Sequence, residues 1–208
     1  ADRRCRRPGS ALLRQLINMN VEATEIAAIK RIKLRLFPDA RGSFSETYRS
    51  DVYARAGIDT VFVQDNLSRS LHAGTIRGLH LQLPPHAQAK LVNVVSGRVL
   101  DIAVDLRMGS PTFAQHVAVE LSAANGEQLY VPEGFAHGFC TLEAETCVAY
   151  KVSAFYAPDH EAGLRWDDPA LGISWPVVAG EAMLSEKDLA LPRLAAFDSP
   201  FLYTPEAV

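Results

Sequence analysis

Two of the six histidines in this sequence stand in settings suited to proton transfer. His80 ends an Arg-Gly-Leu-His segment, and His137 lies within Pro132–Phe139, which reads Pro-Glu-Gly-Phe-Ala-His-Gly-Phe. An imidazole has an unperturbed pKa of about 6.5, so it can accept or give a proton near neutral pH. A histidine that stood alone would be interpreted as a hydrogen-bonded core residue, so the surrounding sequence has to decide.

The turn before His137 has the Pro-x-Gly-x-x-His form that is typical of the second half of the cupin double motif. In metal cupins the first half supplies a His-x-His segment followed by an acidic ligand. At the matching places this sequence has Gln82 and Lys90. A glutamine amide is a poor metal ligand and an ammonium group is none. The sequence therefore predicts a cupin-type barrel with no metal and no cofactor, and it argues against a metal cupin oxygenase.

The elements that would position these histidines are short apolar runs broken by Gly, Pro, Asn and Asp, a spacing typical of an all-β sandwich or barrel. Helix–strand alternation is absent, so a double-sheet jelly roll with a few short helices is the best fit. Helices are expected at 50–57 and 185–191, the second with Ser185 as its N-cap. A hairpin is expected over 91–100, around Ser96-Gly97. The apolar runs are Thr60–Val63, Leu91–Val95, Arg98–Leu106, His116–Leu121, Gln128–Val131 and Thr146–Val152.

The run Arg98–Leu106 has an aspartate within an apolar pattern. Leu100 and Ile102 share one strand face, and Asp101 lies on the other, because side chains alternate along a strand. Asp101 is therefore expected to point away from the apolar layer. For an aspartate, a solvated strand face is the ordinary explanation.

Composition and charge exclude several function classes. The 208 residues are 48% apolar and 22% charged, which is ordinary for a globular protein. A net charge of −3 gives no argument for a nucleic-acid partner or an anionic membrane surface. No run of 18 apolar residues is present, so no membrane span is expected. Three cysteines are too few and odd in number for a disulfide framework, which favours a reducing, cytoplasmic location.

The length suits one domain with a sizeable core. Residues 1–18 are basic and then mildly apolar, and Met19 resembles a natural start, so 1–18 are interpreted as an N-terminal extension without an assigned function. Residues 19–208 are predicted to form a single jelly-roll domain, with a C-terminal tail from about residue 190.

Residues 36–188 resemble the dTDP-4-dehydrorhamnose 3,5-epimerase family. Each matching segment is weak singly, but the ordered set is specific and covers most of the chain. The segments include FPDARGSFSE (37–46), FVQDNLS (62–68), GTIRGLHLQ (74–82), GRVLDIAVDLR (97–107), PEGFAHGF (132–139), WDDPALGISW (166–175) and LSEKD (184–188). The resemblance implies epimerisation at C3 and C5 of dTDP-4-dehydro-6-deoxy-D-glucose, a reaction that removes a proton beside a ketone and returns it to the opposite face.

The resemblance also implies two histidine–carboxylate pairs. His80 matches the family's base and Asp188 matches its partner, although sequence alone would make Asp188 an exposed helix residue. His137 and Asp101 match a second, supporting pair. A carboxylate fixes the tautomer of a histidine and stabilises the imidazolium that forms.

Lys90 and Tyr150 complete the implied catalytic set. Lys90 matches the lysine near the substrate's ketone, where a positive charge stabilises a developing oxyanion. Without the resemblance it would be interpreted as a solvated strand-edge lysine. Tyr150 matches the acid on the far face of the sugar, and it would otherwise be interpreted as a core tyrosine with a satisfied hydroxyl.

The nucleotide end of the substrate needs cations, hydrogen-bond donors and an aromatic ring. The resemblance implies that some contacts come from a neighbouring subunit, and hence a homodimer. In a regular strand Arg77 would face away from His80, unless Gly78 bends the chain. The implied substrate-binding residues are Arg41, Phe44, Glu46, Gln64, Asn66, Arg77, Tyr156 and Lys187.

Other functions remain open from the sequence. Epimerisation at only C3 or C5 of a nucleotide-linked 4-keto-6-deoxy sugar would use the same motifs. A cupin ketoisomerase acting on the same sugar is less favoured by the RGLH, LSEKD and WDDP segments. A jelly roll that binds a sugar nucleotide without catalysis would have no need for a base and an acid on opposite faces.

Overall fold

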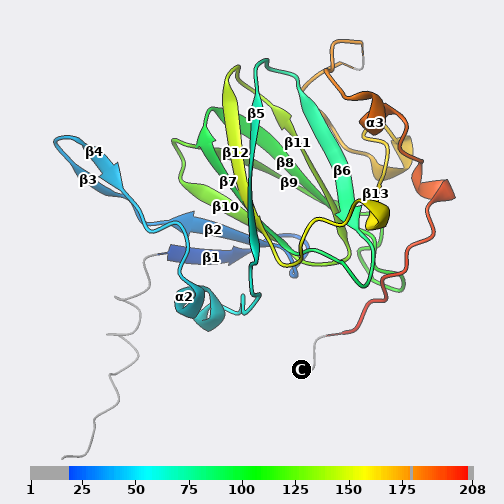
Figure 1. The fold of residues 1–208 in the computed structure, drawn as a ribbon, viewed down its shortest axis with the longest axis horizontal. Helices are drawn as coiled ribbons and strands as arrows, with labels where there is room; N and C mark the ends of the chain where they lie inside the picture. The colour runs from blue at the N-terminus through cyan, green and yellow to red at the C-terminus, as the bar shows by residue number, and fades with distance from the viewer. Residues whose placement is uncertain (1–18, 179, 206–208) are drawn as a thin grey trace, which may run out of the picture.

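The computed structural model describes residues 19–178 and 180–205, and these residues form two antiparallel sheets packed face to face (Figure 1). This arrangement confirms the predicted all-β jelly roll. The larger sheet contains, in spatial order, β1 (Met19–Ala23), β2 (Lys30–Leu34), β10 (Glu127–Val131), β7 (Lys90–Ser96), β12 (Thr146–Val152) and β5 (Gln64–Ser70). The smaller sheet contains β13 (Glu161–Gly163), β6 (Ile76–Gln82), β11 (Phe135–Thr141), β8 (Arg98–Asp105) and β9 (His116–Ser122). The proposed extension at 1–18 lies outside the described residues.

Short elements decorate the two sheets. A small hairpin, β3 (Phe37–Asp39) and β4 (Gly42–Phe44), projects from one side. The helix α2 (Ser50–Arg55) and the helix α3 (Glu186–Leu189) confirm the two predicted helices. Single 3₁₀ turns lie at η1 (Pro158–His160), η2 (Pro169–Leu171) and η3 (Leu194–Ala196). Within the described ranges, no helix is long and apolar enough to cross a membrane.

The main core lies between the two sheets and follows from alternation along the strands. Val92 and Val94 of β7 point inward from the larger sheet, and Val99 and Ala103 of β8 point inward from the smaller one. Each is at most 4% exposed, so the two inner faces exclude water from each other. Lys90 is two residues before Val92 and therefore also points inward.

A second apolar layer covers the outer face of the smaller sheet. Ile102 and Val104 of β8 are fully buried there. Leu194, Phe197 and Phe201 of the C-terminal segment pack against this layer. Residues 194–201 therefore cover part of the outer face of the sheet that carries His80 and His137.

Two predictions about strands were wrong. The runs on either side of Gly97 do not form a hairpin, because β7 belongs to the larger sheet and β8 to the smaller one. Gly97 has a φ of +77° and lies directly against Thr146, so the chain turns a corner between sheets here. The run Thr60–Val63 precedes the strand, which begins at Gln64. A turn signal marks where a strand ends, but it does not specify which strand becomes its partner.

The interpretation of Asp101 as a solvated strand residue, which the family resemblance had already replaced by a buried pair with His137, was wrong. Asp101 does point away from the layer formed by Ile102 and Val104, as its place in the alternation predicts. Its own face, however, is the interior of the jelly roll, where Val99 and Ala103 are buried. Asp101 is 0% exposed. Both faces of β8 are covered, so an aspartate there requires a bonding partner inside.

Candidate active site

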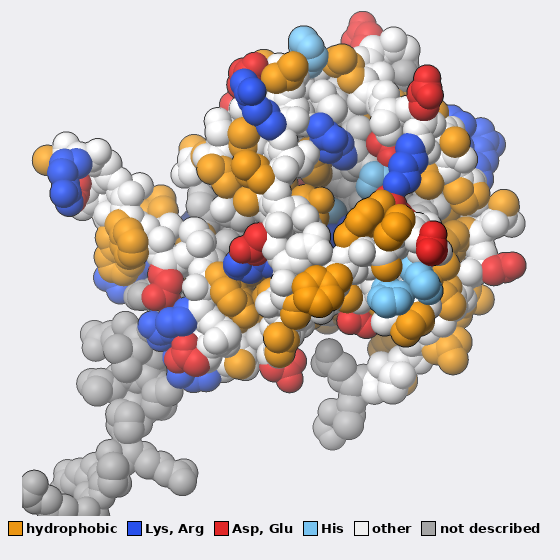
Figure 2. All heavy atoms as spheres, in the orientation of Figure 1, with side chains coloured by type: hydrophobic (Ala, Val, Ile, Leu, Met, Phe, Trp, Pro, Cys, Tyr) orange, Lys and Arg blue, Asp and Glu red, His pale blue; other side chains and the backbone are white. Residues whose placement is uncertain are grey.

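The inward-facing polar residues of both sheets meet around a cavity of about 230 Å³. Figure 2 shows the hollow, with histidine surface inside it and lysine and arginine side chains at its rim. The smaller sheet contributes the histidines, and the larger sheet faces them with a lysine and a tyrosine. The lining residues are Ser68, Arg77, His80, Lys90, His137, Phe139, Tyr150, Ser185, Lys187 and Asp188. All six residues predicted to be catalytic lie in this wall or directly behind it.

His80 on β6 pairs with Asp188 on α3. The distance from His80 Nε2 to Asp188 Oδ1 is 2.5 Å. The Ser185 side chain accepts a hydrogen bond from the Asp188 amide at 3.1 Å, so the N-cap fixes the start of the short helix that holds Asp188. Burial raises the pKa of Asp188, but the hydrogen bonds from His80 and the helix cap outweigh it and leave the pKa below its usual value. Asp188 is therefore a carboxylate at neutral pH, and it orients the imidazole.

His137 on β11 forms the second pair, with Asp101 on β8. His137 Nε2 lies 2.9 Å and 3.0 Å from the two carboxylate oxygens. An unpaired carboxylate at a site this deeply buried would lower the free energy of unfolding by roughly several kcal/mol. His137 therefore stabilises the Asp101 carboxylate, and Asp101 in turn orients the His137 ring. His137 and His80 are directly opposite each other on paired strands, so both imidazoles face the same cavity.

Lys90 begins β7 and is only 7% exposed. Its Nζ donates a hydrogen bond to the backbone oxygen of His80 at 3.1 Å. Burial lowers the pKa of Lys90 to about 8, and the carboxylates of Asp101 and Glu161 oppose this shift. At neutral pH Lys90 is therefore an ammonium group inside the cavity, and not the solvated strand-edge lysine of the alternative interpretation.

Tyr150 on β12 faces the histidines from the opposite sheet. Val148 and Val152 share its strand face and are buried, while Tyr150 itself lines the cavity. Burial raises the pKa of the Tyr150 hydroxyl, and the positive charge of Arg77 opposes the rise. The phenol therefore holds its proton at neutral pH and can donate it.

Arg77 faces the same cavity as His80, contrary to the expectation for a regular strand. His80 is opposite His137, but Arg77 is opposite Phe139. β6 therefore has one more residue than β11 between these two pairs, which is a β-bulge. The bulge includes Gly78, whose φ is +113°. A bulge changes the alternation of a strand, so both side chains point inward. In the sequence, Gly78 was the only indication of this bulge.

Three wall residues and one rim residue were not predicted from the sequence. Ser68, Phe139 and Ser185 line the cavity, and the buried Ser68 hydroxyl has no partner among the described residues. Glu161 accepts hydrogen bonds from Lys187 Nζ at 2.5 Å and from the Tyr156 hydroxyl at 2.7 Å. These bonds hold the pKa of Glu161 below its usual value although burial raises it. No motif near Glu161 marked it, because its partners lie on other elements.

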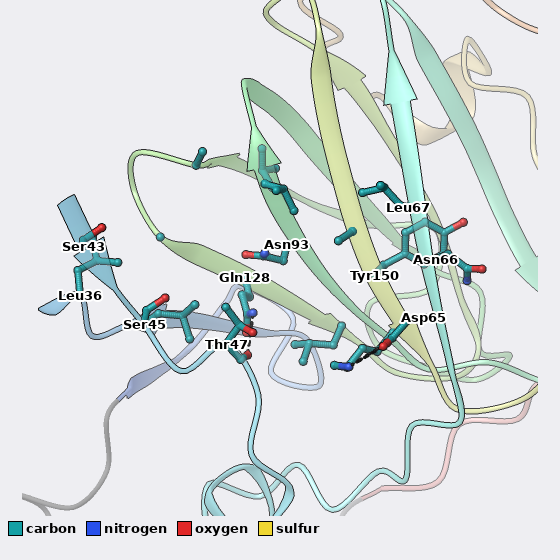
Figure 3. A pocket seen from close by; sticks show the side chains of 18 residues that line it. Leu36, Ser43, Ser45, Thr47, Asp65, Asn66, Leu67, Asn93, Gln128 and Tyr150 are labelled. Atoms are coloured by element: carbon teal, nitrogen blue, oxygen red, sulfur yellow. Dashed lines mark hydrogen bonds and ion pairs between the residues drawn. The ribbon is translucent and has the colours of Figure 1, made fainter. Parts of the chain in front are cut away.

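The predicted binding residues on β5 are already engaged within the chain. Gln64 and Asn66 lie on one strand face, and Gln64 Nε2 donates to Asn66 Oδ1 at 2.9 Å. The Gln64 oxygen accepts from the backbone amide of Tyr156 at 3.0 Å. Asn66 and Tyr150 occupy directly opposite positions on β5 and β12 (Figure 3).

The predicted residues Arg41, Phe44 and Glu46 are not brought to this cavity. They lie on or next to the β3–β4 hairpin, which projects on the side of the molecule opposite α3 (Figure 1). Arg41 pairs with Asp39 at 2.6 Å, and Phe44 is 69% exposed. The hairpin borders a larger hollow of about 610 Å³ on the outer face of the larger sheet (Figure 3). That hollow has no histidine in its lining.

The ionisable pairs at the cavity are two histidines with two aspartates, and a lysine lies beside them. Among residues 19–178 and 180–205, no group of three or more His, Cys, Asp or Glu side chains is placed to hold a metal ion. The arrangement can remove a proton with a histidine, stabilise negative charge with an ammonium group, and return a proton from a phenol on the opposite wall.

Comparison with known proteins identifies the family of this chain. The family model described as dTDP-4-dehydrorhamnose 3,5-epimerase matches residues 23–196. The epimerase of that name from Sinorhizobium fredii is 49% identical over 189 residues, covering 91% of this chain and 96% of the relative. The crystal structure of the Bacillus anthracis enzyme, with TDP and pyrophosphate bound, superposes with a TM-score of 0.82 at 50% identity and covers 85% and 99% of the two chains.

A second solved structure is dTDP-6-deoxy-D-glucose-3,5-epimerase from Legionella pneumophila, in complex with dTDP-4-keto-L-rhamnose. It has a TM-score of 0.85 and 43% identity, and the match covers 90% of this chain and all of that one. Fold, motifs and sequence identity agree along nearly the whole described chain. The chain belongs to the dTDP-4-dehydrorhamnose 3,5-epimerase family, whose members are isomerases.

Proposed function

We propose that this protein inverts both C3 and C5 of dTDP-4-dehydro-6-deoxy-D-glucose and so forms dTDP-4-dehydro-L-rhamnose. The observation that carries the proposal is that the His80–Asp188 pair and the Tyr150 hydroxyl line one cavity from opposite sheets. Epimerisation needs a base on one face of a carbon and an acid on the other. The sugar ring would lie between the two sheets.

His80 is the base in this mechanism. Its Nε2 is bonded to Asp188, which leaves the other ring nitrogen to take the proton beside the ketone. The Asp188 carboxylate stabilises the imidazolium that forms. The electron pair of the broken C–H bond moves into an enolate, whose oxygen needs a positive partner.

Lys90 supplies that positive charge. Its ammonium group is buried, so it interacts with the enolate oxygen with little screening by water. Tyr150 then gives its proton to the carbon from the far face, which inverts the centre. Its raised pKa keeps the phenol protonated before this step. His137, held by its bond to Asp101, lies opposite His80 and keeps a polar side chain in the cavity wall beside the base.

The nucleotide would extend from the cavity across its rim. Arg77 and Lys187 are cationic side chains at the edge of the wall and suit a diphosphate. Tyr156 is 56% exposed and presents a ring on which a planar base can stack. Asn66 lies beside Tyr150 and can bond a polar group of the substrate.

The remaining predicted contacts support a homodimer. None of Arg41, Phe44 and Glu46 lines the cavity of its own chain, and the first two belong to the hairpin, where Phe44 is exposed. Such residues can contact substrate if the hairpin reaches the cavity of a second copy. In this proposal each active site is completed by the hairpin of the partner.

Inversion at a single carbon is the second candidate, because the same base, lysine and acid would serve it. Proton NMR of the substrate in D₂O distinguishes the two. Loss of both the C3 and C5 signals, with a product reducible to dTDP-L-rhamnose, is the expected result. Loss of one signal would keep the mechanism and change the product. A folded protein that exchanged neither proton, beside an active control enzyme, would contradict catalysis and favour a sugar-nucleotide-binding jelly roll.

A further inference from the structure

Residues 154–157, which follow β12 and carry Tyr156, are held by an unusual set of contacts. Their backbone groups bond to the side chains of three glutamines that come from different parts of the chain. These residues are outside the strands and helices, so regular pairing does not satisfy their backbone groups. We name residues 154–157 the tyrosine segment.

Gln82, at the end of β6, makes the central contacts. Its Nε2 donates to the backbone oxygen of Phe155 at 3.2 Å, and its Oε1 accepts from the amide of Ala157 at 2.9 Å. The two bonds lie on either side of Tyr156 and together resemble one rung of a sheet. Nε2 also donates to the backbone oxygen of His86 at 2.7 Å. Gln82 is 3% exposed, so none of these bonds competes freely with water.

Two further glutamines complete the set. Gln64 on β5 accepts from the amide of Tyr156 itself at 3.0 Å. Gln88, in the loop before β7, donates to the backbone oxygen of Ala154 at 2.7 Å. All four consecutive residues of the tyrosine segment therefore have a backbone group fixed by a glutamine side chain. An amide can do this because it carries a donor and an acceptor in one plane.

The aromatic ring of Tyr156 is thus exposed at the surface, while the backbone that carries it is held in place. The Tyr156 side chain is exposed, but its hydroxyl is bonded to Glu161 at the other end. A loop of this kind would otherwise lose conformational freedom when it bound a ligand, and that loss would weaken binding. Fixing the ring beforehand removes this cost.

We propose that Gln82, Gln64 and Gln88 are positioning residues that hold the Tyr156 ring at the mouth of the cavity for the planar base of the nucleotide. The proposal rests on the proposed function, which places a nucleotide at this rim. Gln82 occupies the place of a metal ligand in metal cupins, and here its amide serves substrate affinity instead. The alternative is that the glutamines only stabilise the fold.

The first test is Gln82→Leu in the full-length protein, with dTDP as the probe. Calorimetric titration should show a Kd for dTDP raised about ten-fold, since the stacking ring is no longer fixed. The KM for the sugar nucleotide should rise to a similar extent. The kcat should stay within about two-fold of wild type, because His80, Lys90 and Tyr150 are untouched. An unchanged Kd in a folded variant would overturn the proposal.

Gln88 provides a second test that does not depend on the folding of the Gln82 variant. Gln88→Leu removes the donor to the Ala154 backbone oxygen and should raise the Kd for dTDP several-fold. Gln115→Leu, an exposed glutamine before β9, is the control for the substitution itself and should leave the Kd unchanged. An unchanged Kd in a folded Gln88→Leu variant would contradict the proposal.

A double-mutant cycle decides whether Gln82 acts through Tyr156. In a Tyr156→Ala background, Gln82→Leu should raise the Kd for dTDP by less than about two-fold, because there is no ring left to position. A full ten-fold effect in that background would overturn the proposal. A wild type that binds dTDP but does not turn over the sugar nucleotide would contradict the proposed function alone, and the titrations would still decide the role of the glutamines.

Discussion

At the scale of single residues, the chemistry depends on pairs whose members are far apart in the chain. His80 and Asp188 are 108 positions apart, yet their side chains are 2.5 Å apart. Asp188 is only 4% exposed, although it lies on a four-residue helix near the surface. Its burial and its bond to His80 have one cause, because α3 packs against β6. The carboxylate is thereby available to stabilise a charged imidazole.

Replacing His80 with alanine should abolish most of the turnover. A general base contributes typically 10²- to 10⁴-fold, so we expect kcat to fall by about 1,000-fold. The fold should persist, since His80 is partly exposed at the cavity wall. The measurement is exchange of the C3 and C5 protons in D₂O, with circular dichroism to monitor folding. His72→Ala, at an exposed histidine in a loop, is the matched control and should behave as wild type. Near-normal turnover by His80→Ala would remove His80 from the role of base.

Tyr150→Phe should separate proton removal from inversion. The variant keeps the base and the lysine but has no phenolic proton to deliver. We expect deuterium to enter at the reacting carbons while formation of the inverted product slows by about 100-fold. Proton NMR in D₂O reports exchange and product together. If exchange also stopped, Tyr150 would be required for the first step and would be more than the far-face acid.

The protonation of Lys90 predicts how the rate depends on pH. Burial lowers the pKa of Lys90 to about 8, so the fraction of ammonium falls as the pH rises through that value. The kcat/KM should therefore decrease on the alkaline side, with a midpoint near pH 8. In Lys90→Arg the guanidinium stays charged over this range, and the alkaline decrease should disappear even if the absolute rate is lower. An unchanged alkaline midpoint in that variant would assign the decrease to another group.

At the scale of elements, one irregular strand decides what the cavity can bind. β6 has a bulge at Gly78 that turns Arg77 and His80 to the same side. Gly78 and Gly138 face each other across the two strands, and a side chain on Gly78 would lie 2.6 Å from the His137 backbone oxygen. The base and the diphosphate-binding arginine that we propose are therefore neighbours because two glycines let the backbones approach closely.

Gly78→Ala should damage both the fold and the site. The new methyl group would clash with β11, and the φ of +113° is unfavourable for alanine. We expect the free energy of unfolding to fall by about 3 kcal/mol or more. Gly109→Ala is the control, because Gly109 also has a positive φ but open space around it, and only about 1 kcal/mol should be lost. Urea unfolding measures both. Equal losses would show that contact with β11 contributes nothing.

At the scale of the whole molecule, the proposed active site extends beyond one chain. The β3–β4 hairpin with Arg41 and Phe44 projects away from the body of the subunit, and none of its residues lines the cavity with His80 (Figure 2). The hairpin packs mainly against itself, and Phe44 and Phe37 contact each other at its base, 6.4 Å between ring centres. An exposed aromatic hairpin of this kind fits a contact with a second copy better than it fits solvent.

Subunit mixing tests this arrangement. His80→Ala retains the hairpin, and the double variant Arg41→Ala/Phe44→Ala retains the base. After joint refolding, half of the dimers would be mixed, and each would hold one complete site. Activity should then recover to about a quarter of the wild-type value, although each parent alone is nearly inactive. A monomer by light scattering, or no recovery on mixing, would place the hairpin outside the site.

The sequence by itself determined the fold class, the two short helices and six of the polar residues that lie at or directly behind the cavity wall. Strand alternation and turn residues are local properties, so they can be read without knowing the partners. The ordered motifs then indicated the family, and through it the pairs of His80 and His137 with their aspartates. The match to the family model over 23–196 agrees with that resemblance.

Only the tertiary structure decided which strands pair and which faces are inside. It separated β7 and β8 into different sheets, buried Asp101, and turned Arg77 toward His80 through the bulge at Gly78. It also brought Glu161 and the glutamines around Tyr156 together from separate elements. The physical reason is that these features depend on packing between segments that are distant in the sequence. A local sequence pattern does not specify which distant segment will pack against it.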